Sequence, residues 1–217
     1  ISMGFFRKGS HIISDVSECS IQHPLINETF SVVKSLLRDY GVSAYDEVSH
    51  TGLLRHVVIR VAVHTEEVMV IFVTSEHGFP NIEMLSEKLV QLVPNVKSVI
   101  QNVNSKKTNV ILGHENQLIL GRNFILEQIA HLQFKISPLS FVQVNPEQTE
   151  VLYNIVKNYA GLSGRETVID AFCGIGTISL FLAGLAKHVY GIEIVPDAIK
   201  DATENAKLNN ITNAHFI

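Results

Sequence analysis

Apolar side chains recur at helical spacing in two segments of the first half of the chain. In "HPLINETFSVVKSLLRDYG" (residues 23–41) they fall at steps of three and four, at Leu25, Ile26, Phe30, Val33, Leu36 and Leu37. This period predicts an amphipathic helix with Gly41 as its C-cap. A second helix is predicted over "NIEMLSEKLVQLVP", where Pro94 ends it because proline lacks the N–H that a helix needs.

The segments around these helices have the pattern of β-strands. Apolar and β-branched residues fill Leu53–His64 and Val68–Thr74, and the short polar stretch between them predicts a hairpin. Shorter strands are predicted in "VKSVIQNVN", "NVILG", "QLILG" and "LQFKIS". Helices mixed with hairpin strands indicate an α+β central domain over residues 1–137.

After Pro138 strands and helices alternate. Asn145 and Pro146 are placed to cap and to begin a helix over "NPEQTEVLYNIVKNYAG". The apolar segments "ETVIDAF" and "HVYGIEI" predict buried strands of a parallel sheet, the first of them in its middle, and each precedes a helical segment. "AHFI" begins a third strand. This β-α-β-α-β order is the N-terminal half of an α/β, Rossmann-like domain, predicted over residues 138–217. Since so few strands leave an edge and a face uncovered, we expect the sequence to be a piece of a longer protein.

Composition narrows the class of protein only a little. Hydrophobic residues make up 46% and charged residues 18% of the chain, which is ordinary for a globular protein. No apolar run reaches the roughly 18 residues that a membrane span needs, and the first residues lack the features of a signal peptide. We therefore expect a cytoplasmic protein without a membrane partner. The two cysteines lie far apart, which argues against a disulfide scaffold.

The net charge of −4 lacks the excess of lysine and arginine that is typical of nucleic-acid-binding domains. Lysines and arginines number 12 against 13 acidic residues through Val142, and 5 against 8 from Gln143 onward. Contacts to RNA would therefore rest on local clusters such as "FFRKGSH" and "NSKKTN", which the sequence alone explains better as solvated turns.

The candidate chemistry lies in "VIDAFCGIGTISLF". Asp170, Gly174 and Gly176 form a D-x-x-x-G-x-G pattern at the end of the first predicted Rossmann strand, and Glu193 ends the second strand 23 residues after Asp170. Glycines let the backbone turn sharply and approach a ligand, and an acidic residue at the second strand end can accept hydrogen bonds from ribose hydroxyls. The NAD fingerprint needs a third glycine, where this chain has Ser179. The pattern therefore favours S-adenosylmethionine over a dinucleotide or a purely structural loop.

Upstream, Phe141 and Gln143 alternate in "SFVQVNPEQTEVLY". The residues alone favour an ordinary role, with Phe141 in a core and Gln143 capping a backbone group.

These segments together resemble the RumA/TrmA family of RNA uracil-5-methyltransferases. The resemblance rests on "SFVQVNPEQTEVLY", "VIDAFCGIGTISLFLA" and "VYGIEIVPDAIKDATENAKLNNI", and on "GFFRKGSH", "YDEVSHTGLLRHVVIR" and "QNVNSKKTNVILG" in the first domain. It is strongest to bacterial members that act on large-subunit ribosomal RNA. It implies that the parent protein uses S-adenosylmethionine to methylate C5 of a uridine in 23S ribosomal RNA, acting as a monomer on a flipped-out or single-stranded base.

The resemblance also implies the cofactor contacts. The family's F-x-Q-x-N motif places Gln143 against the cofactor, and Glu193 is expected to hold the ribose. The full set of expected cofactor-binding residues is Gln143, Asp170, Phe172, Gly174, Gly176, Thr177 and Glu193.

The groups that would perform the chemistry are not in this sequence. C5 of uracil is a poor nucleophile until a thiolate adds to C6, and a base must later remove the C5 proton. The family takes that thiolate from a cysteine after a D-P-P-R-like segment and the base from a glutamate further on, and neither segment occurs before Ile217. We therefore expect no catalytic residue in this chain and no activity from it alone.

The two cysteines present have other expected roles. Cys173 lies in the loop around the cofactor, on the wrong side of the methyl group to attack a pyrimidine, and a tight turn favours a small residue there. Cys19 resembles the fourth ligand of a [4Fe–4S] cluster found in some family members. Its three partners would precede Ile1, and the alternative is an ordinary half-buried cysteine.

Three other functions stay open on the sequence. A tRNA uracil-5-methyltransferase shares the motifs, a non-catalytic RNA-binding or assembly factor could retain the cofactor fold, and a dinucleotide oxidoreductase shares the Rossmann-like pattern.

Overall fold

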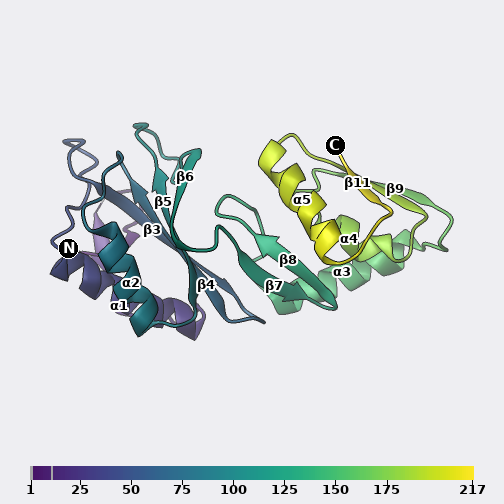
Figure 1. Ribbon diagram of the computed structural model, residues 1–217, viewed down its shortest axis with the longest axis horizontal. Helices are drawn as coiled ribbons and strands as arrows, with labels where there is room; N and C mark the ends of the chain where they lie inside the picture. The colour runs from purple at the N-terminus through teal and green to yellow at the C-terminus, as the bar shows by residue number, and fades with distance from the viewer. Residues whose placement is uncertain (1, 11) are drawn as a thin grey trace. The chain divides into compact units, whose positions relative to one another are not determined.

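The computed structural model describes residues 2–10 and 12–217, so that His11 of the "FFRKGSH" cluster lies outside the described residues (Figure 1). The chain forms two compact units. The first comprises the residues up to 62 together with 66–125, and the second comprises 63–65 with 126–217. The sequence predicts a boundary after residue 137, whereas the compact units divide twelve residues earlier.

The first unit is an α+β domain built on a mixed sheet. Its elements are β1 (Gly4–Phe6), β2 (Ile13–Asp15), α1 (Pro24–Asp39), β3 (Leu54–Ala62), β4 (Glu67–Thr74), α2 (Ile82–Leu92), β5 (Val96–Val103) and β6 (Glu115–Gly121). Strands β1 and β2 form a separate antiparallel pair, and the main sheet has the order β3-β4-β5-β6. Strand β5 runs parallel to β4, because α2 carries the chain back between them.

Both predicted helices of this unit are confirmed. The imidazole of His23 accepts a hydrogen bond from Leu25 at the start of α1. Gly41, just past the end of α1, has a φ of +64°, a conformation that glycine adopts without strain. The two helices contact each other, and their apolar stripes pack on the sheet in one core that includes Val33, Leu37 and Leu89.

The predicted strand over "NVILG" is wrong. Residues 104–114 form a loop instead, because side chains take up its backbone groups. The Asn104 amide donates to the carbonyls of Val110 and Ile111 at 2.7 and 3.0 Å, and the Gly113 N–H donates to Asn102 Oδ1 at 2.7 Å. These bonds replace a strand ladder with local contacts.

The second unit carries the predicted β-α-β-α-β succession. Its elements are β7 (Ile125–Ile129), β8 (Leu132–Ile136), α3 (Pro146–Ala160), β9 (Thr167–Ala171), α4 (Thr177–Ala183), β10 (His188–Ile192), α5 (Pro196–Leu208) and β11 (Ala214–Phe216). Helix α3 begins as predicted, with Asn145 Oδ1 accepting from the Gln148 N–H at 3.0 Å.

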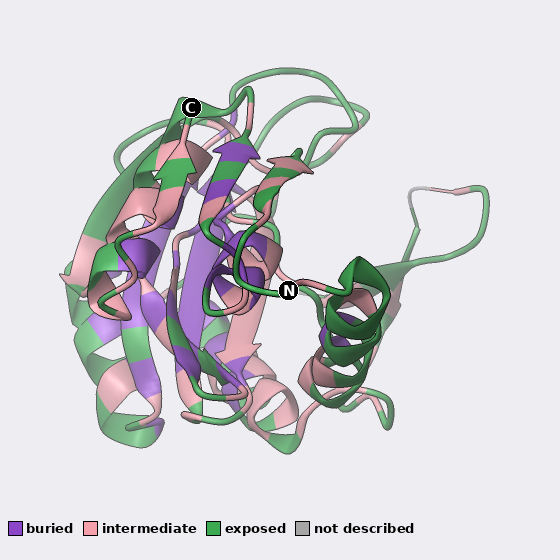
Figure 2. Ribbon diagram, turned by 90° about the vertical axis from the view of Figure 1, so that its right-hand side faces the viewer, coloured by how far each residue is buried: buried purple, intermediate pink, exposed green. Residues whose placement is uncertain are grey.

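The three strands β9, β10 and β11 form a parallel sheet in the order β11-β10-β9. The expectation that β9 lies in the middle of the sheet is wrong for the described residues, where it is an edge strand. The helices cover one face of this sheet only. On β10, Val189 is fully buried beneath the helices, whereas Tyr190 on the opposite face is exposed. Ile169 of β9 is likewise 68% exposed. Figure 2 shows how buried and exposed residues alternate along the strands.

The hairpin of β7 and β8 explains the shifted boundary, since it packs with the second unit. The Lys135 N–H donates to Asn205 Oδ1 of α5 at 2.7 Å, and the Gln133 N–H donates to Asn209 Oδ1 at 2.8 Å. Phe134 is buried in a core shared with Tyr153 and Leu180. Across residues 2–10 and 12–217, every helix falls short of the length and apolarity that a membrane crossing needs.

Candidate cofactor-binding site

The glycine loop turns the chain sharply from β9 into α4. The N–H groups of Phe172 and Cys173 donate to the Ile192 carbonyl at 2.8 and 3.1 Å, which fastens the loop to the end of β10. Gly174 and Gly176 have φ angles of +56° and +82°. The loop therefore sits at the carboxyl ends of the parallel strands, where open α/β sheets bind ligands.

The two glycines serve different needs. A Cβ on Gly176 would lie 2.9 Å from the Phe216 ring and 3.2 Å from Ala202, so this glycine is required for packing as well as for its backbone angle. A Cβ on Gly174 would meet nothing within 4 Å. The free space at Gly174 is therefore available to a ligand.

Glu193 connects the carboxyl end of β10 to the loop that follows β9. Its Oε2 accepts from the Gly174 N–H at 3.1 Å, and its Oε1 accepts from the N–H groups of Ile194 and Val195 at 2.8 and 3.1 Å. A carboxylate offers about four acceptor positions. One position thus remains for a ligand hydroxyl after these three bonds have fixed the side chain.

Asp170 and Thr177 form hydrogen bonds to side chains of the helices beside the loop. Asp170 Oδ2 accepts from the buried Ser179 hydroxyl at 2.5 Å. The Thr177 hydroxyl lies 2.8 Å from the Tyr153 hydroxyl, which connects α4 to α3. Burial is the main cause of a raised Tyr153 pKa, so its phenol stays protonated and can donate to Thr177. These bonds hold the loop in shape.

A pocket of about 160 Å³ opens beside Gly174. Its lining residues come from the turn before α3, the glycine loop and the start of α5, and they are Ser137, Leu139, Ser140, Phe141, Gly174, Ile175, Glu193, Val195, Asp197, Ala198 and Asp201. Of the seven residues predicted to bind cofactor, Gly174 and Glu193 line this pocket. Sequence reasoning missed Ser137, Ser140, Asp197 and Asp201, although two aspartates four residues apart at a helix start were a visible signal.

The other predicted contacts lie outside this lining. Gln143 is exposed. Phe172 is 88% exposed and has a φ of +65°, a strained conformation for a side chain of this size. Such strain is concentrated at functional sites, and the cofactor roles of Gln143 and Phe172 stay predictions.

Every charged residue in the pocket lining is acidic, namely Glu193, Asp197 and Asp201. S-adenosylmethionine carries a positive sulfonium and a positive ammonium group, which such a lining attracts. The pyrophosphate of a dinucleotide carries two negative charges, which the lining repels. The residues present therefore fit the nucleoside and cationic groups of S-adenosylmethionine better than a dinucleotide.

Cys173 has the properties of a structural residue. It is 7% exposed, and its thiol contacts the Gly174 carbonyl at 3.7 Å. Burial, with smaller contributions from the charges of Asp170 and Glu193, raises its pKa to about 11. A thiol protonated at neutral pH is a poor nucleophile.

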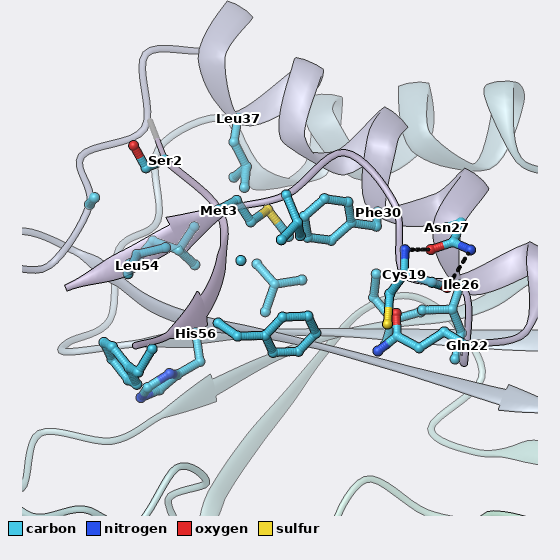
Figure 3. A pocket seen from close by; sticks show the side chains of 18 of the residues that line it. Ser2, Met3, Cys19, Gln22, Ile26, Asn27, Phe30, Leu37, Leu54 and His56 are labelled. Atoms are coloured by element: carbon cyan, nitrogen blue, oxygen red, sulfur yellow. Dashed lines mark hydrogen bonds between the residues drawn. The ribbon is translucent and has the colours of Figure 1, made fainter. Parts of the chain in front are cut away.

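A larger cavity of about 230 Å³ lies in the first unit, between the β1–β2 pair, α1 and β3. Figure 3 shows Met3, Phe30 and Leu37 around it, with Cys19 at one side. The Asn27 amide clamps the Cys19 backbone, accepting from its N–H at 2.9 Å and donating to its carbonyl at 3.0 Å. Within the described part of the chain, histidine, cysteine and carboxylate side chains form no group of three that could hold a metal ion. An iron–sulfur role for Cys19 stays a prediction.

Comparison with known proteins relates both units to RNA methyltransferases. Residues 162–217 match the family model described as a methyltransferase domain. A protein of Halalkalibacterium halodurans named as an uncharacterized RNA methyltransferase is 50% identical over 98% of this chain and 46% of its own length. A protein of the same description from Oceanobacillus iheyensis is 47% identical over the whole chain and 47% of its own length. The chain thus spans about half the length of the curated relatives it matches.

Among solved structures, the chain is similar to the tRNA (uracil-54, C5)-methyltransferase of Pyrococcus abyssi in complex with S-adenosyl-L-homocysteine. The TM-score is 0.82 at 29% identity, over 98% of this chain and 51% of the Pyrococcus chain. Together with the family model, this similarity shows a methyltransferase fold.

Proposed function

We propose that this chain is the cofactor-binding part of an RNA uracil-5-methyltransferase, which transfers a methyl group from S-adenosylmethionine to C5 of a uridine in 23S ribosomal RNA. The observation that carries the proposal is the acidic pocket at the strand ends, where Glu193 is fixed beside the open face of Gly174. The similarity to a uracil C5 methyltransferase bound to S-adenosyl-L-homocysteine supports the same cofactor and reaction.

The chain's own residues are assigned to holding the cofactor. Glu193 accepts a ribose hydroxyl at its remaining acceptor position, Gly174 admits the ligand to the backbone, and the acidic lining favours its positive groups. The cofactor supplies an electrophilic methyl group. Gln143 and Phe172 complete the site when the cofactor is bound, as the family resemblance implies.

The activation of uracil is assigned to residues outside 1–217. In the proposed reaction a cysteine thiolate adds to C6, C5 then takes the methyl group, and a glutamate removes the C5 proton so that the thiolate can leave. The buried, protonated thiol of Cys173 is unsuited to this step. We therefore propose that the full-length protein is the enzyme and that the 217-residue chain is inactive alone.

A tRNA substrate is the alternative to ribosomal RNA, because the Pyrococcus structure is that of a tRNA enzyme. The test is to incubate the full-length protein with S-adenosylmethionine and either 23S ribosomal RNA or tRNA from a strain lacking its gene, and to measure 5-methyluridine by mass spectrometry. Product in 23S RNA is expected. Product only in tRNA makes the protein a tRNA enzyme, and no product in either RNA favours a non-catalytic RNA-binding factor.

Calorimetry on the 217-residue chain separates the cofactor question from the substrate question. We expect S-adenosylmethionine to bind and NAD to give no heat. Tighter binding of NAD contradicts the proposal and favours an oxidoreductase.

A further inference from the structure

A cluster of polar side chains fastens one wall of the cofactor pocket to α5. Asp201 Oδ2 accepts hydrogen bonds from the hydroxyls of both Ser137 and Ser140, the latter at 2.8 Å. The two hydroxyls lie 2.6 Å apart. Asp201 lies more than 60 residues from the serines in sequence, so these bonds join distant parts of the chain.

The serines close a tight turn in the chain. The Ser137 N–H donates to Ser140 Oγ at 3.1 Å, and the Ser140 N–H donates to the Ser137 carbonyl at 3.2 Å. This turn presents Leu139 to the pocket, and Phe141 follows it directly. The pocket wall therefore has its shape set by the turn and its position set by Asp201.

The opposite wall is fixed independently. Asn205, one helical turn after Asp201, donates to the Ile175 carbonyl of the glycine loop at 3.2 Å. Helix α5 thus holds the glycine loop through Asn205 and the serine turn through Asp201. Both walls are therefore attached to the same helix, α5, which keeps the distance between them constant.

We propose that Asp201 is a positioning residue for the cofactor: by binding Ser137 and Ser140 it holds the 137–141 wall at the distance from Gly174 that S-adenosylmethionine requires. This inference rests on the proposed function for the identity of the ligand. A wall that is already ordered costs less conformational entropy when the ligand binds. Asp201 acts through the serines in this proposal, and a direct contact with the ligand's positive groups is the competing role.

The test compares four variants of the chain by calorimetric titration with S-adenosylmethionine. Asp201→Ala and the double variant Ser137→Ala/Ser140→Ala are both expected to raise Kd at least tenfold. Asp201→Asn keeps a neutral oxygen that can accept both hydroxyls but loses one of the three lining charges, so its Kd is expected to fall between those of the wild type and Asp201→Ala. Glu204→Ala is the matched control, because Glu204 lies on the same helix and pairs with Lys135 Nζ at 3.1 Å, outside the pocket lining. It is expected to leave Kd within twofold.

Two binding outcomes overturn the positioning role. If Asp201→Ala weakens binding and the double serine variant does not, Asp201 contacts the ligand directly. If Asp201→Asn is as damaging as Asp201→Ala, the charge itself is what the ligand needs. A fall in melting temperature shared equally by Asp201→Ala and Glu204→Ala, without a difference in Kd, assigns Asp201 to stability alone.

Hydrogen–deuterium exchange without ligand keeps the test independent of the cofactor's identity. Asp201→Ala is expected to speed exchange of the Ser137 and Ser140 amides, which donate within the turn, while Glu204→Ala leaves them protected. If the wild type fails to bind S-adenosylmethionine but exchange rises as expected, the proposed function is wrong and the fastening of the wall stands. Unchanged exchange in Asp201→Ala overturns the inference whatever the ligand.

Discussion

The Gly174 amide donates to Glu193 Oε2 at 3.1 Å, so the glycine loop after β9 and the acidic end of β10 form one structure before any ligand arrives. From the sequence, these two residues are expected to contact a cofactor separately. The bond shows that Glu193 also orders the loop. Loss of its charge therefore acts on the site twice, through the ligand and through the loop.

Glu193→Gln is expected to weaken S-adenosylmethionine binding. Hydrogen bonds to a charged acceptor contribute about 1.5–3 kcal/mol, which corresponds to a loss of about 10- to 150-fold in affinity. Titration calorimetry measures it, with Glu147→Gln in the exposed first turn of α3 as control. Equal affinities for the two variants would remove Glu193 from the site.

Replacing each glycine of the loop by alanine should separate stability from binding. Gly176→Ala introduces a Cβ against the Phe216 ring at a φ of +82°, and such strain costs on the order of 1–3 kcal/mol of unfolding free energy. Gly174→Ala meets no atom within 4 Å. Its φ of +56° strains an alanine too, but without a clash, so this variant should keep more of the stability. It should lose more of the ligand affinity, because Gly174 lines the pocket. Urea unfolding and calorimetry on both variants check the contrast, which a larger stability loss in Gly174→Ala would contradict.

Cys173 should resist alkylation. With a pKa of about 11, about one molecule in a thousand carries the thiolate at pH 8. Iodoacetamide at pH 8 is expected to modify the partly exposed Cys19 first, as peptide mass spectrometry will show. Rapid modification of Cys173 in the folded chain would mean that its thiol is activated.

The same raised pKa makes stability depend on pH on the alkaline side. Folded Cys173 keeps its proton up to about 11, whereas the unfolded thiol loses it near its ordinary value of 9.0. The stabilisation is therefore present below pH 9 and is lost as the pH rises from 9 to 11. Cys173→Ala should flatten this part of the stability curve in urea titrations; an unchanged slope would assign it to other groups.

Arg55 should be a determinant of the first unit's stability. Its side chain is 1% exposed and donates to the carbonyls of Asn104 and Lys106 at 2.8 and 2.7 Å. Arg55→Ala leaves these acceptors without their donor, at an expected cost of about 2–3 kcal/mol in urea unfolding. Lys107→Ala in the same loop alters an exposed side chain and should stay within about 0.5 kcal/mol of the wild type. Similar effects of both substitutions would show that the loop contributes little.

Periodicity predicted the elements whose stability comes from one continuous apolar face. Helix α1 follows this rule, because its buried residues recur at helical spacing. Strand β4 is buried on both faces, and its continuous apolar run predicted it instead. The 104–114 loop follows neither pattern, because Asn102, Asn104 and Arg55 decide its path through bonds to its backbone. An apolar sequence such as "NVILG" carries no trace of those partners.

The cofactor site was predicted in part for a related reason. Gly174 and Glu193 are visible because a glycine turn and a strand-end carboxylate have a recognisable spacing. Ser137 has no such signal, and its bond to Asp201 cannot be foreseen from the sequence, since the two residues lie 64 positions apart and meet only when α5 packs beside β8. Their contribution follows from tertiary structure.

The three stretches that line the pocket are brought together only in the folded unit. A ligand that contacts all three binds the native state and ignores the unfolded chain, so at 100 times its Kd it adds about 2.7 kcal/mol to the folding free energy by mass action. With S-adenosylmethionine as the proposed ligand, its concentration sets part of the resistance of this unit to unfolding and to proteases.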